Sequence, residues 1–392
     1  MNDRGNMSKK HDNKMVRNPF PYAEIVTGPD FADRKEEIRE LSRDLTSGEK
    51  ILISSPRRFG KTSLIFETAR RLKTKKLVFI YVDLMRATSL SRFVELYATA
   101  QARATATKVD DMAQALRRIL PRLRPDITLR PDGLPEVSMR FAHLKRDIWE
   151  AFSSVLDAPE QFAQEKDVPV AVVFDEFQEV SGLGKGVVEE LRSRLQFHKR
   201  CAYVFMGSKR HMLAGMFDDR SGPLFKLARP IVLTRIPRKE FSTYISGKYS
   251  KAEMPVPEKL IDEILNISEG HPYYTQLICH ALYNHLLEGG SADPAGLREV
   301  VSGTIRGQSF AYLSLWDSLS VKQKALVMGL AVEGNHANIF SGDFVAAYGL
   351  TSAATVQRAV RTLENKGVIE REPEGYAIAD IFFGRWVEGE IQ

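Results

Sequence analysis

The sequence of 392 residues contains only two cysteines, Cys201 and Cys279, and each lies within an apolar stretch. So few cysteines cannot form a disulfide framework, and burial in a reducing cytoplasm is the simplest interpretation of both. The sequence also lacks any run of about 18 apolar residues, and the polar residues 1–18 lack the apolar centre of a signal peptide. We therefore expect a cytoplasmic protein with no membrane partner.

A strong excess of charge of one sign is missing as well. The formal net charge is +6 and the isoelectric point is about 9.1, which are small departures for a chain of this length. This balance permits contact with nucleic acid without arguing for it. With 43% hydrophobic and 27% charged residues, the composition is that of a globular protein.

Short apolar runs separated by helical patterns predict an α/β fold with a mostly parallel sheet. The runs cover residues 51–54, 77–82, 170–174, 202–206 and 231–233. Single cores stop growing near ~250–300 residues, so several domains are expected. The predicted organisation is a flexible tail over 1–18, a core over 19–237 with a hairpin insertion at about 100–150, a helical lid over 238–305 and a winged helix-turn-helix over 306–392.

The most specific motif is Ser-Pro-Arg-Arg-Phe-Gly-Lys-Thr, which fits G-x-x-x-x-G-K-[ST] except that Ser55 replaces the first glycine. The motif follows an apolar strand and opens a helical pattern, as a phosphate loop requires. Lys61 is predicted to reach the β- and γ-phosphates, Gly60 to let the backbone approach closely, and Thr62 to ligate Mg²⁺. The nucleotide-binding residues predicted in this loop are Ser55, Pro56, Arg57, Arg58, Phe59, Gly60, Lys61, Thr62 and Ser63.

Two acids, Asp175 and Glu176, end the third apolar run. Beside a phosphate loop, Asp175 is expected to hold Mg²⁺ through water, and Glu176 to orient and deprotonate the attacking water. The adjacent glutamate favours ATP hydrolysis over a kinase-type or GTPase-type reaction. The alternative is that both acids merely cap a following helix.

Further candidates lie after the fourth and before the fifth run. Ser208 is a candidate γ-phosphate sensor and Arg210 a candidate catalytic cation beside it, although Ser208 is equally interpreted as a helix cap. Arg220 or Arg229 is a candidate arginine finger acting on a neighbouring subunit. Each arginine is also explained as a surface salt-bridge residue.

With these motifs the chain resembles the archaeal-type ATPase family, within the STAND and ORC/Cdc6-like part of the AAA+ proteins. Phe31, Arg34 and Glu37 fit the family's F-x-x-R-x-x-E entry to the fold, and Gly270-His271-Pro272 is similar to the G-x-P sensor of STAND proteins. The resemblance implies a P-loop NTPase fold with a helical lid and a C-terminal winged helix, and it implies ATP or ADP with Mg²⁺ as cofactors.

The resemblance also assigns residues. Phe31 and Arg34 are implied in the adenine pocket, and His271 and Pro272 are implied to touch nucleotide from the lid, although a histidine alone is usually a satisfied structural residue. The chain departs from the family at Ser55 and has no plain arginine finger.

The winged-helix segment leaves two interpretations open. If Ser352 to Lys366 is a recognition helix, its apolar stripe is buried and Gln357, Arg358, Arg361, Asn365 and Lys366 face outward toward DNA. Alternatively, this unit packs on the core as an internal lid or binds a protein partner.

The predicted function is a slow or partner-stimulated ATP-binding and ATP-hydrolysing molecular switch. A DNA-binding ATPase of the initiator or transposition-helper kind, an ADP-locked signalling module with negligible turnover, and a homo-oligomeric assembly all remain open.

Overall fold

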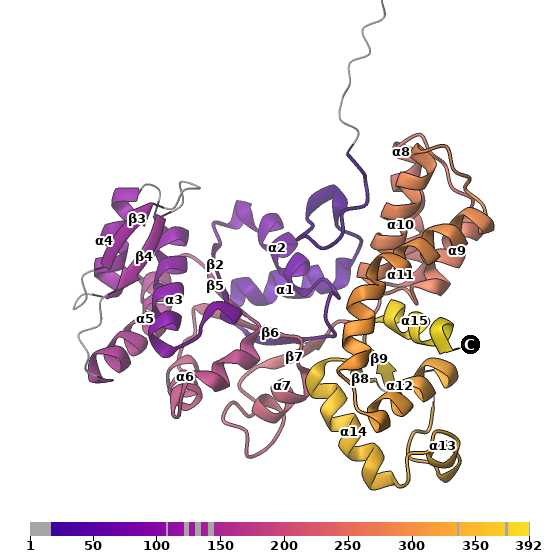
Figure 1. Ribbon diagram of the computed structural model, residues 1–392. Helices are drawn as coiled ribbons and strands as arrows, with labels where there is room; N and C mark the ends of the chain where they lie inside the picture. Colours follow the sequence, from indigo (N-terminus) through magenta and orange to yellow (C-terminus); the bar gives the residue numbers. More distant parts are fainter. Residues whose placement is uncertain are drawn as a thin grey trace, which may run out of the picture.

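The computed structural model of the chain describes residues 17–106, 109–120, 125–129, 135–139, 145–334, 337–372 and 375–391 (Figure 1). At positions 75, 109–110, 125–129, 135–139, 145 and 390–391 only the backbone is described. No helix within these ranges is long and apolar enough to span a bilayer.

Five parallel strands form the central sheet in the order β2-β5-β6-β1-β7. They are β1 (Lys50–Ser54), β2 (Val78–Asp83), β5 (Val170–Asp175), β6 (Cys201–Gly207) and β7 (Arg229–Val232). Every residue of β5 and β6 is buried, as in strands that are covered on both faces. The predicted parallel α/β sheet is therefore confirmed.

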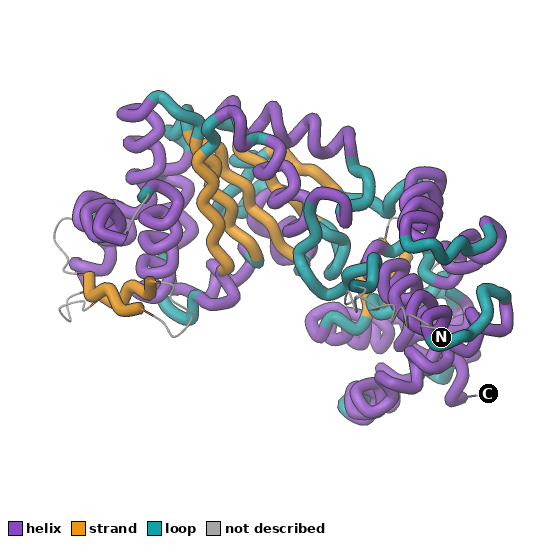
Figure 2. Tube along the Cα trace, turned by 90° about the horizontal axis from the view of Figure 1, so that it is seen from above, coloured by secondary structure: helices purple, strands orange, loops and turns teal. Residues whose placement is uncertain are grey.

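Helices cover both faces of this sheet (Figure 2). Apolar side chains of α1 and α2 pack on one face, and side chains from α3 to α7 pack on the other. These helices are α1 (Lys35–Ser47), α2 (Lys61–Arg71), α3 (Leu90–Thr105), α4 (Val109–Ile119), α5 (Lys145–Lys166), α6 (Val187–Leu195) and α7 (Arg210–Phe217). Short 3₁₀ turns lie between them at η1 (Gly28–Asp30), η2 (Lys73–Lys75), η3 (Leu84–Arg86) and η4 (Phe177–Leu183).

A two-stranded antiparallel sheet lies within the segment between β2 and β5. Its strands are β3 (Pro125–Leu129) and β4 (Pro135–Met139), paired in the register Ile127 with Val137. The predicted hairpin strands are confirmed, while the Pro-Asp-Gly turn at 131–133 lies outside the described residues. Figure 1 places this hairpin at the end of the molecule opposite the C-terminal half.

The chain after β7 is mostly helical. We call α8, α9 and α10 the helical unit and the elements from α12 onward the winged helix. The bounds are α8 (Arg238–Lys251), α9 (Glu258–Ile267), α10 (Pro272–Leu287), α11 (Pro294–Asp317), α12 (Val321–Glu333), α13 (Gly342–Ala347), α14 (Ala353–Lys366), β8 (Ile369–Glu372), β9 (Gly375–Ile378) and α15 (Ile381–Ile391). The boundary expected at 305–306 falls inside α11, which runs unbroken from one unit to the other.

One apolar cluster joins the helical unit and the winged helix. It includes Leu282 on α10, Tyr312 on α11 and Phe382 on α15, together with Phe20 from the N-terminal segment. Because packed interiors deform little, these two units form one body against the α/β core. Cys201 and Cys279 are buried free thiols, as the sequence predicts.

Candidate nucleotide site

The predicted phosphate loop connects β1 to α2 at the carboxyl edge of the sheet. Its backbone passes through left-handed conformations at Arg58, with a φ of 62°, and at Gly60, with a φ of 86°. Gly60 caps α2, so unpaired backbone N–H groups of the first helical turn face the space above the loop. Ser55 is not in a left-handed conformation. A side chain is therefore tolerated where the motif usually has glycine.

Lys61 is the buried cation of this loop, with 6% of its surface exposed. Its ammonium donates to the backbone oxygens of Ser55 and Pro56, both at 3.0 Å, and to the Ser55 hydroxyl at 3.2 Å. Burial lowers the pKa of Lys61 to about 8, against the attraction of Glu176 and Asp175. A buried ammonium whose hydrogen-bond acceptors are all uncharged is a strong site for an anion.

Thr62 and Asp175 lie together, as predicted for a metal site. The Thr62 hydroxyl donates to Asp175 Oδ2 at 2.9 Å, although 113 positions separate the two residues. Tyr81, within β2, donates its phenol to the same oxygen at 2.7 Å. Hydroxyl and carboxylate oxygens are the ligands that Mg²⁺ prefers, and it completes its shell with water and phosphate oxygens. This donor set fits Mg²⁺.

Glu176 follows Asp175 in a left-handed conformation with a φ of 50°. Its carboxylate accepts the Gln178 side-chain amide and the Ser208 hydroxyl, the latter at 3.1 Å. Gln178 is 1% exposed, and its Oε1 has no partner among the described residues. A methyl group on Gly207 would approach that oxygen to 2.2 Å. Gly207 therefore makes room for the amide that holds Glu176.

The start of α7 tests one of the two interpretations of Ser208, while its role as a γ-phosphate sensor stays a prediction. Helix α7 begins at Arg210, and its cap residue is Lys209, without a side-chain capping bond. The interpretation of Ser208 as a helix cap is therefore wrong. Because β6 lies between β5 and β1, Ser208 emerges between the phosphate loop and the acids.

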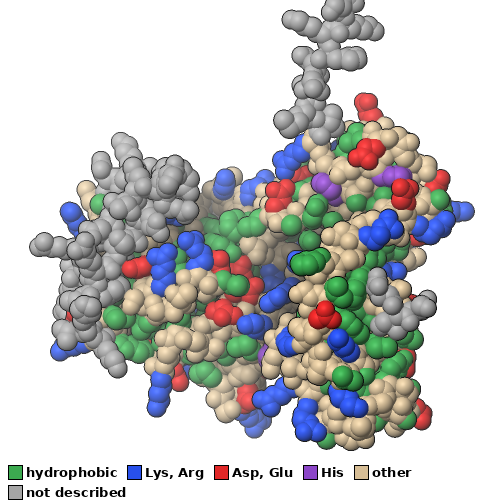
Figure 3. Space-filling view, in the orientation of Figure 1, with side chains coloured by type: hydrophobic (Ala, Val, Ile, Leu, Met, Phe, Trp, Pro, Cys, Tyr) green, Lys and Arg blue, Asp and Glu red, His purple; other side chains and the backbone are tan. Residues whose placement is uncertain are grey.

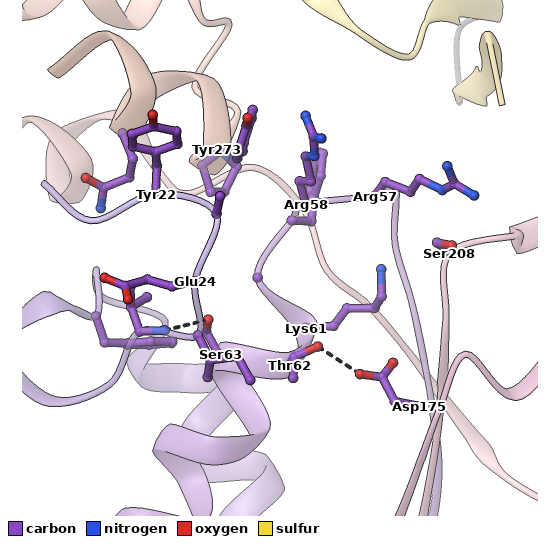
Figure 4. Close-up of a pocket in the computed structure, with 18 of the residues that line it drawn as sticks. Tyr22, Glu24, Arg57, Arg58, Lys61, Thr62, Ser63, Asp175, Ser208 and Tyr273 are labelled. Carbon is purple, nitrogen blue, oxygen red and sulfur yellow. Dashed lines mark hydrogen bonds between the residues drawn. The ribbon is translucent and has the colours of Figure 1, made fainter. Parts of the chain in front are cut away.

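A cavity of about 670 Å³ lies above these side chains, within the usual range for ligand pockets. Lys61, Thr62, Asp175, Glu176 and Ser208 line one end, while the segment 21–26 and the residues Phe241, Tyr273 and Gln276 line the rest. Figure 4 shows Tyr22 and Tyr273 on one side and Lys61 and Asp175 on the other. Figure 3 shows the surface hollowed between the α/β core and the C-terminal half.

Phe31 and Arg34 both line this cavity, but the Arg34 guanidinium is engaged elsewhere. It donates to the backbone oxygens of Phe59 at 3.2 Å and Thr234 at 3.0 Å, and it pairs with Glu37 at 3.0 Å. Burial lowers the pKa of Arg34. Arg34 therefore links the phosphate loop, at Phe59, to the segment after β7, at Thr234.

Of the two residues predicted from the G-x-P motif, Pro272 lines the cavity and His271 does not. The His271 ring packs edge-on against Phe59 with centroids 4.6 Å apart, and its Nδ1 accepts the Tyr273 amide at 3.2 Å. Burial lowers the pKa of His271 to about 3, so the ring is neutral. Next to it, the Arg58 guanidinium lies 4.2 Å from the centre of the Tyr273 ring and links the phosphate loop to α10.

Arg210 lies outside the cavity lining and contacts the winged helix. Its guanidinium donates to the Arg371 carbonyl and lies 3.8 Å from the Glu370 carboxylate on β8. Burial raises the pKa of Glu370 to about 7, against the attraction of Arg210. A neighbouring pair, Arg235 with Glu372 at 3.4 Å, joins the chain after β7 to the same strand.

The two candidate arginine fingers differ in surroundings. Arg229 pairs with Glu40 at 2.6 Å and with Asp44, both on α1, so its guanidinium is held within the chain. Arg220 is exposed.

The outward face of α14 agrees with the predicted pattern. Val356, Ala359, Val360 and Leu363 are buried, whereas Gln357, Arg358 and Arg361 are exposed. Lys366 is exposed too, but its ammonium donates to the Ser318 carbonyl at 2.9 Å.

Several residues of the site had no role assigned from the sequence. Tyr81 lies in the strand that pairs with β5, two positions before its last residue, and Gln178 lies two positions after Glu176. An aromatic hydroxyl in the neighbouring strand, and an amide just beyond the acids, are the signals that point to them.

A phosphate loop between a strand and a helix, paired with acids at the end of a parallel strand, defines a P-loop NTPase. Residues 31–277 match the family of ATPase domains that come predominantly from Archaea, and residues 310–389 match a family of probable winged helix domains. The chain belongs to this archaeal ATPase family and is a P-loop ATPase that ends in a winged helix.

Two solved structures extend over nearly the whole chain. The Walker-type ATPase PABY2304 of Pyrococcus abyssi is 16% identical with a TM-score of 0.66, and the match covers 94% of this chain and 99% of that one. The ORC2 protein of Aeropyrum pernix, solved in ADPNP-ADP complexes, is 14% identical with a TM-score of 0.58, over 96% and 98% of the two chains. No curated protein matches the sequence. At these identities the likeness concerns the fold.

Proposed function

We propose that this chain is a molecular switch that binds ATP and Mg²⁺ between the α/β core and the helical unit and hydrolyses ATP to ADP and phosphate. The observation that carries the proposal is the shared cavity, to which the core contributes Lys61 and Asp175 and the helical unit contributes Tyr273 and Gln276. A ligand that contacts both units favours the arrangement of the two units that binds it more tightly. It shifts the equilibrium between arrangements by the difference in its affinity for each.

Each residue of the phosphate end has a role in the reaction. Lys61 and the backbone N–H groups of the loop stabilise the charge on the transferred phosphoryl group. Thr62 and Asp175 would hold Mg²⁺, which would supply positive charge to the phosphates when bound. Glu176 accepts a proton from water as the water oxygen bonds to the γ-phosphorus and the bond to the leaving ADP oxygen breaks.

The surroundings of Glu176 support slow or partner-stimulated turnover. Gln178 and Ser208 both donate to its carboxylate, and these bonds compete with the bond to an attacking water. A change that releases one of them would raise the share of protein in which Glu176 is free to act as a base.

The winged helix is proposed to act as an internal lid in this switch. The observations that support this are the contacts of Arg210 with β8 and the apolar cluster common to the winged helix and the helical unit. Arg210 lies three residues after Gly207 at the end of β6, so a γ-phosphate near Ser208 would attract the same guanidinium that now contacts Glu370.

A second candidate function is a DNA-binding ATPase, favoured by the exposed Arg358 and Arg361 on the outward face of α14. These side chains lie on the face that a recognition helix turns toward a major groove. A homo-oligomer that donates an arginine, such as the exposed Arg220, is a further proposal.

The test is steady-state phosphate release by the purified protein with Mg²⁺ and ATP, with and without duplex DNA. We expect measurable turnover that Glu176→Gln reduces by about 10²-fold or more while ATP binding is retained. Negligible turnover together with tightly retained ADP would contradict the hydrolysing switch and support an ADP-locked signalling module.

DNA distinguishes the second candidate in the same assay. Stimulation by duplex that is lost in the Arg358→Ala/Arg361→Ala double variant would support DNA binding through α14, whereas a rate unaffected by duplex would count against it.

A further inference from the structure

The N-terminal strap, which we define as residues 18–31, is fixed to the helical unit at its beginning. Phe20 is fully buried, and its ring centroid lies 4.5 Å from that of Tyr249 on α8. His280 on α10 donates a ring N–H to the Phe20 carbonyl at 2.8 Å, and Asn18 donates to the His280 carbonyl at 3.0 Å. The strap therefore starts inside the core of the helical unit.

The second half of the strap is fixed to α2, the helix that follows the phosphate loop. The Val26 amide donates to the Ser63 hydroxyl at 3.1 Å, and the Gly28 amide donates to Glu67 Oε2 at 2.8 Å. Residues four apart share one face of a helix, so Ser63 and Glu67 present two acceptors side by side to the strap. Figure 4 shows the first of these bonds at the start of α2.

Glu67 is unusual for an acid in the middle of a helix because its side chain is completely buried. Arg70 and Arg71 pair with the carboxylate at 2.8 Å and 2.7 Å from the solvent side. The hydrogen bonds from Arg70, together with those from Gly28 and Arg71, lower the pKa of Glu67 to about 2. The carboxylate is therefore charged at physiological pH, and it accepts the Gly28 amide as an anion.

Between its two attachments the strap forms one wall of the cavity. Residues 21–26 line the cavity, and so do Asp30 and Phe31. Figure 4 shows Tyr22 and Glu24 at a distance from Lys61 and Asp175, on the side where Tyr273 lies. When the triphosphate is bound at Lys61, this wall is left for the nucleoside.

We infer that Ser63 and Glu67 are positioning residues that hold the strap as the wall for the base and ribose of the nucleotide. The inference rests on the proposed function, because it requires the triphosphate to bind at Lys61. Ser63 was predicted from the motif to bind nucleotide, which stays a prediction, and its hydroxyl accepts the Val26 amide of the strap. The chemical class recognised through these two residues is a nucleoside, and the triphosphate is bound independently of them.

The test compares the affinity for ATP with that for inorganic tripolyphosphate, which has the phosphates without the nucleoside. Ser63→Ala and Glu67→Met each remove one acceptor, and losing a buried hydrogen bond is expected to raise the Kd for ATP about tenfold. The Kd for tripolyphosphate should stay within about twofold, because the loop and Lys61 are unchanged. Calorimetric titration of the purified full chain measures both.

Matched variants separate positioning from a general loss of stability. Thr68→Val removes a buried hydroxyl on the same helix whose one partner among the described residues is the Leu64 carbonyl, and it should leave both affinities unchanged. Glu67→Gln keeps an oxygen acceptor for the Gly28 amide, and it should bind ATP nearly as the natural protein does. A melting curve verifies that each variant is folded.

Equal weakening of both ligands by Ser63→Ala and Glu67→Met, or no change in either, would overturn the inference. Failure of the natural protein to bind tripolyphosphate and ATP alike would instead overturn the proposed function.

Discussion

The phosphate end and the base end of the cavity are built in different ways. At the phosphate end, Asp175 ends β5, while Ser208 and Lys61 follow the neighbouring strands β6 and β1, so the pairing of these strands brings the three residues together. At the base end, the strap comes from the beginning of the chain and Tyr273 from α10, and neither belongs to the sheet. The difference shows that the phosphate end depends on sheet register and the base end on the packing of distant segments.

This comparison predicts two kinds of variant. A change at the phosphate end should affect every ligand that carries a triphosphate, because the charges there act on the phosphates. A change at the base end should affect only ligands with a nucleoside.

Lys61→Ala should weaken ATP and inorganic tripolyphosphate together, each by on the order of 100-fold, since two charge-assisted hydrogen bonds to phosphate would be lost. Equilibrium binding of both ligands measures this. Lys50→Ala is the matched control, because its ammonium donates to the His198 carbonyl at the other end of β1. A loss confined to ATP would contradict the division between the two ends.

Tyr81→Phe should raise the Mg²⁺ concentration needed for half-maximal hydrolysis by about tenfold, the usual cost of removing a residue that orients a metal ligand. Its phenol donates to the same Asp175 oxygen that accepts from Thr62. The measurement is the rate of phosphate release against Mg²⁺ at saturating ATP. Tyr249→Phe, which loses a buried hydrogen bond to the Cys279 carbonyl, should leave the Mg²⁺ dependence unchanged.

Tyr273→Leu should weaken ATP binding about threefold, since the contact of an aromatic ring with the base contributes on the order of 0.5–1 kcal/mol. Tyr273 lines the cavity, and the Arg58 guanidinium lies over its ring. Titration with ATP and with tripolyphosphate checks the effect, which should appear for ATP alone. Equal weakening of the two ligands would place Tyr273 functionally at the phosphate end.

Much of the fold was predictable from the sequence because its signals are local. The run Val170 to Phe174 is apolar throughout, as in a strand buried on both faces, and the loop from Ser55 to Thr62 follows another such strand. The stripe of α14 was predictable for the same reason, because the buried side of a helix repeats every three to four residues.

The rest depends on contacts between residues far apart in the chain. Glu67 has the sequence pattern of a surface acid paired with Arg70 and Arg71, and only the packing of the strap on α2 reveals its bond to Gly28. The contact of Arg210 with β8 joins residues 161 positions apart, and no local pattern predicts it. His271 fits the G-x-P motif, but its ring packs against Phe59 between the phosphate loop and the helical unit. It therefore does not line the cavity.

The attachment of Phe20 has a kinetic consequence. Phe20 belongs to the same apolar cluster as α10, α11 and α15, so any rotation of that body carries the start of the strap with it. The residues between Phe20 and the bond at Val26 span at most about 20 Å, so separation of the two halves would pull on this wall of the cavity. On the proposed function, loss of bound ADP would then be coupled to opening of the molecule. The dissociation rate of a fluorescent ADP analogue would therefore report how often the helical half swings away from the core.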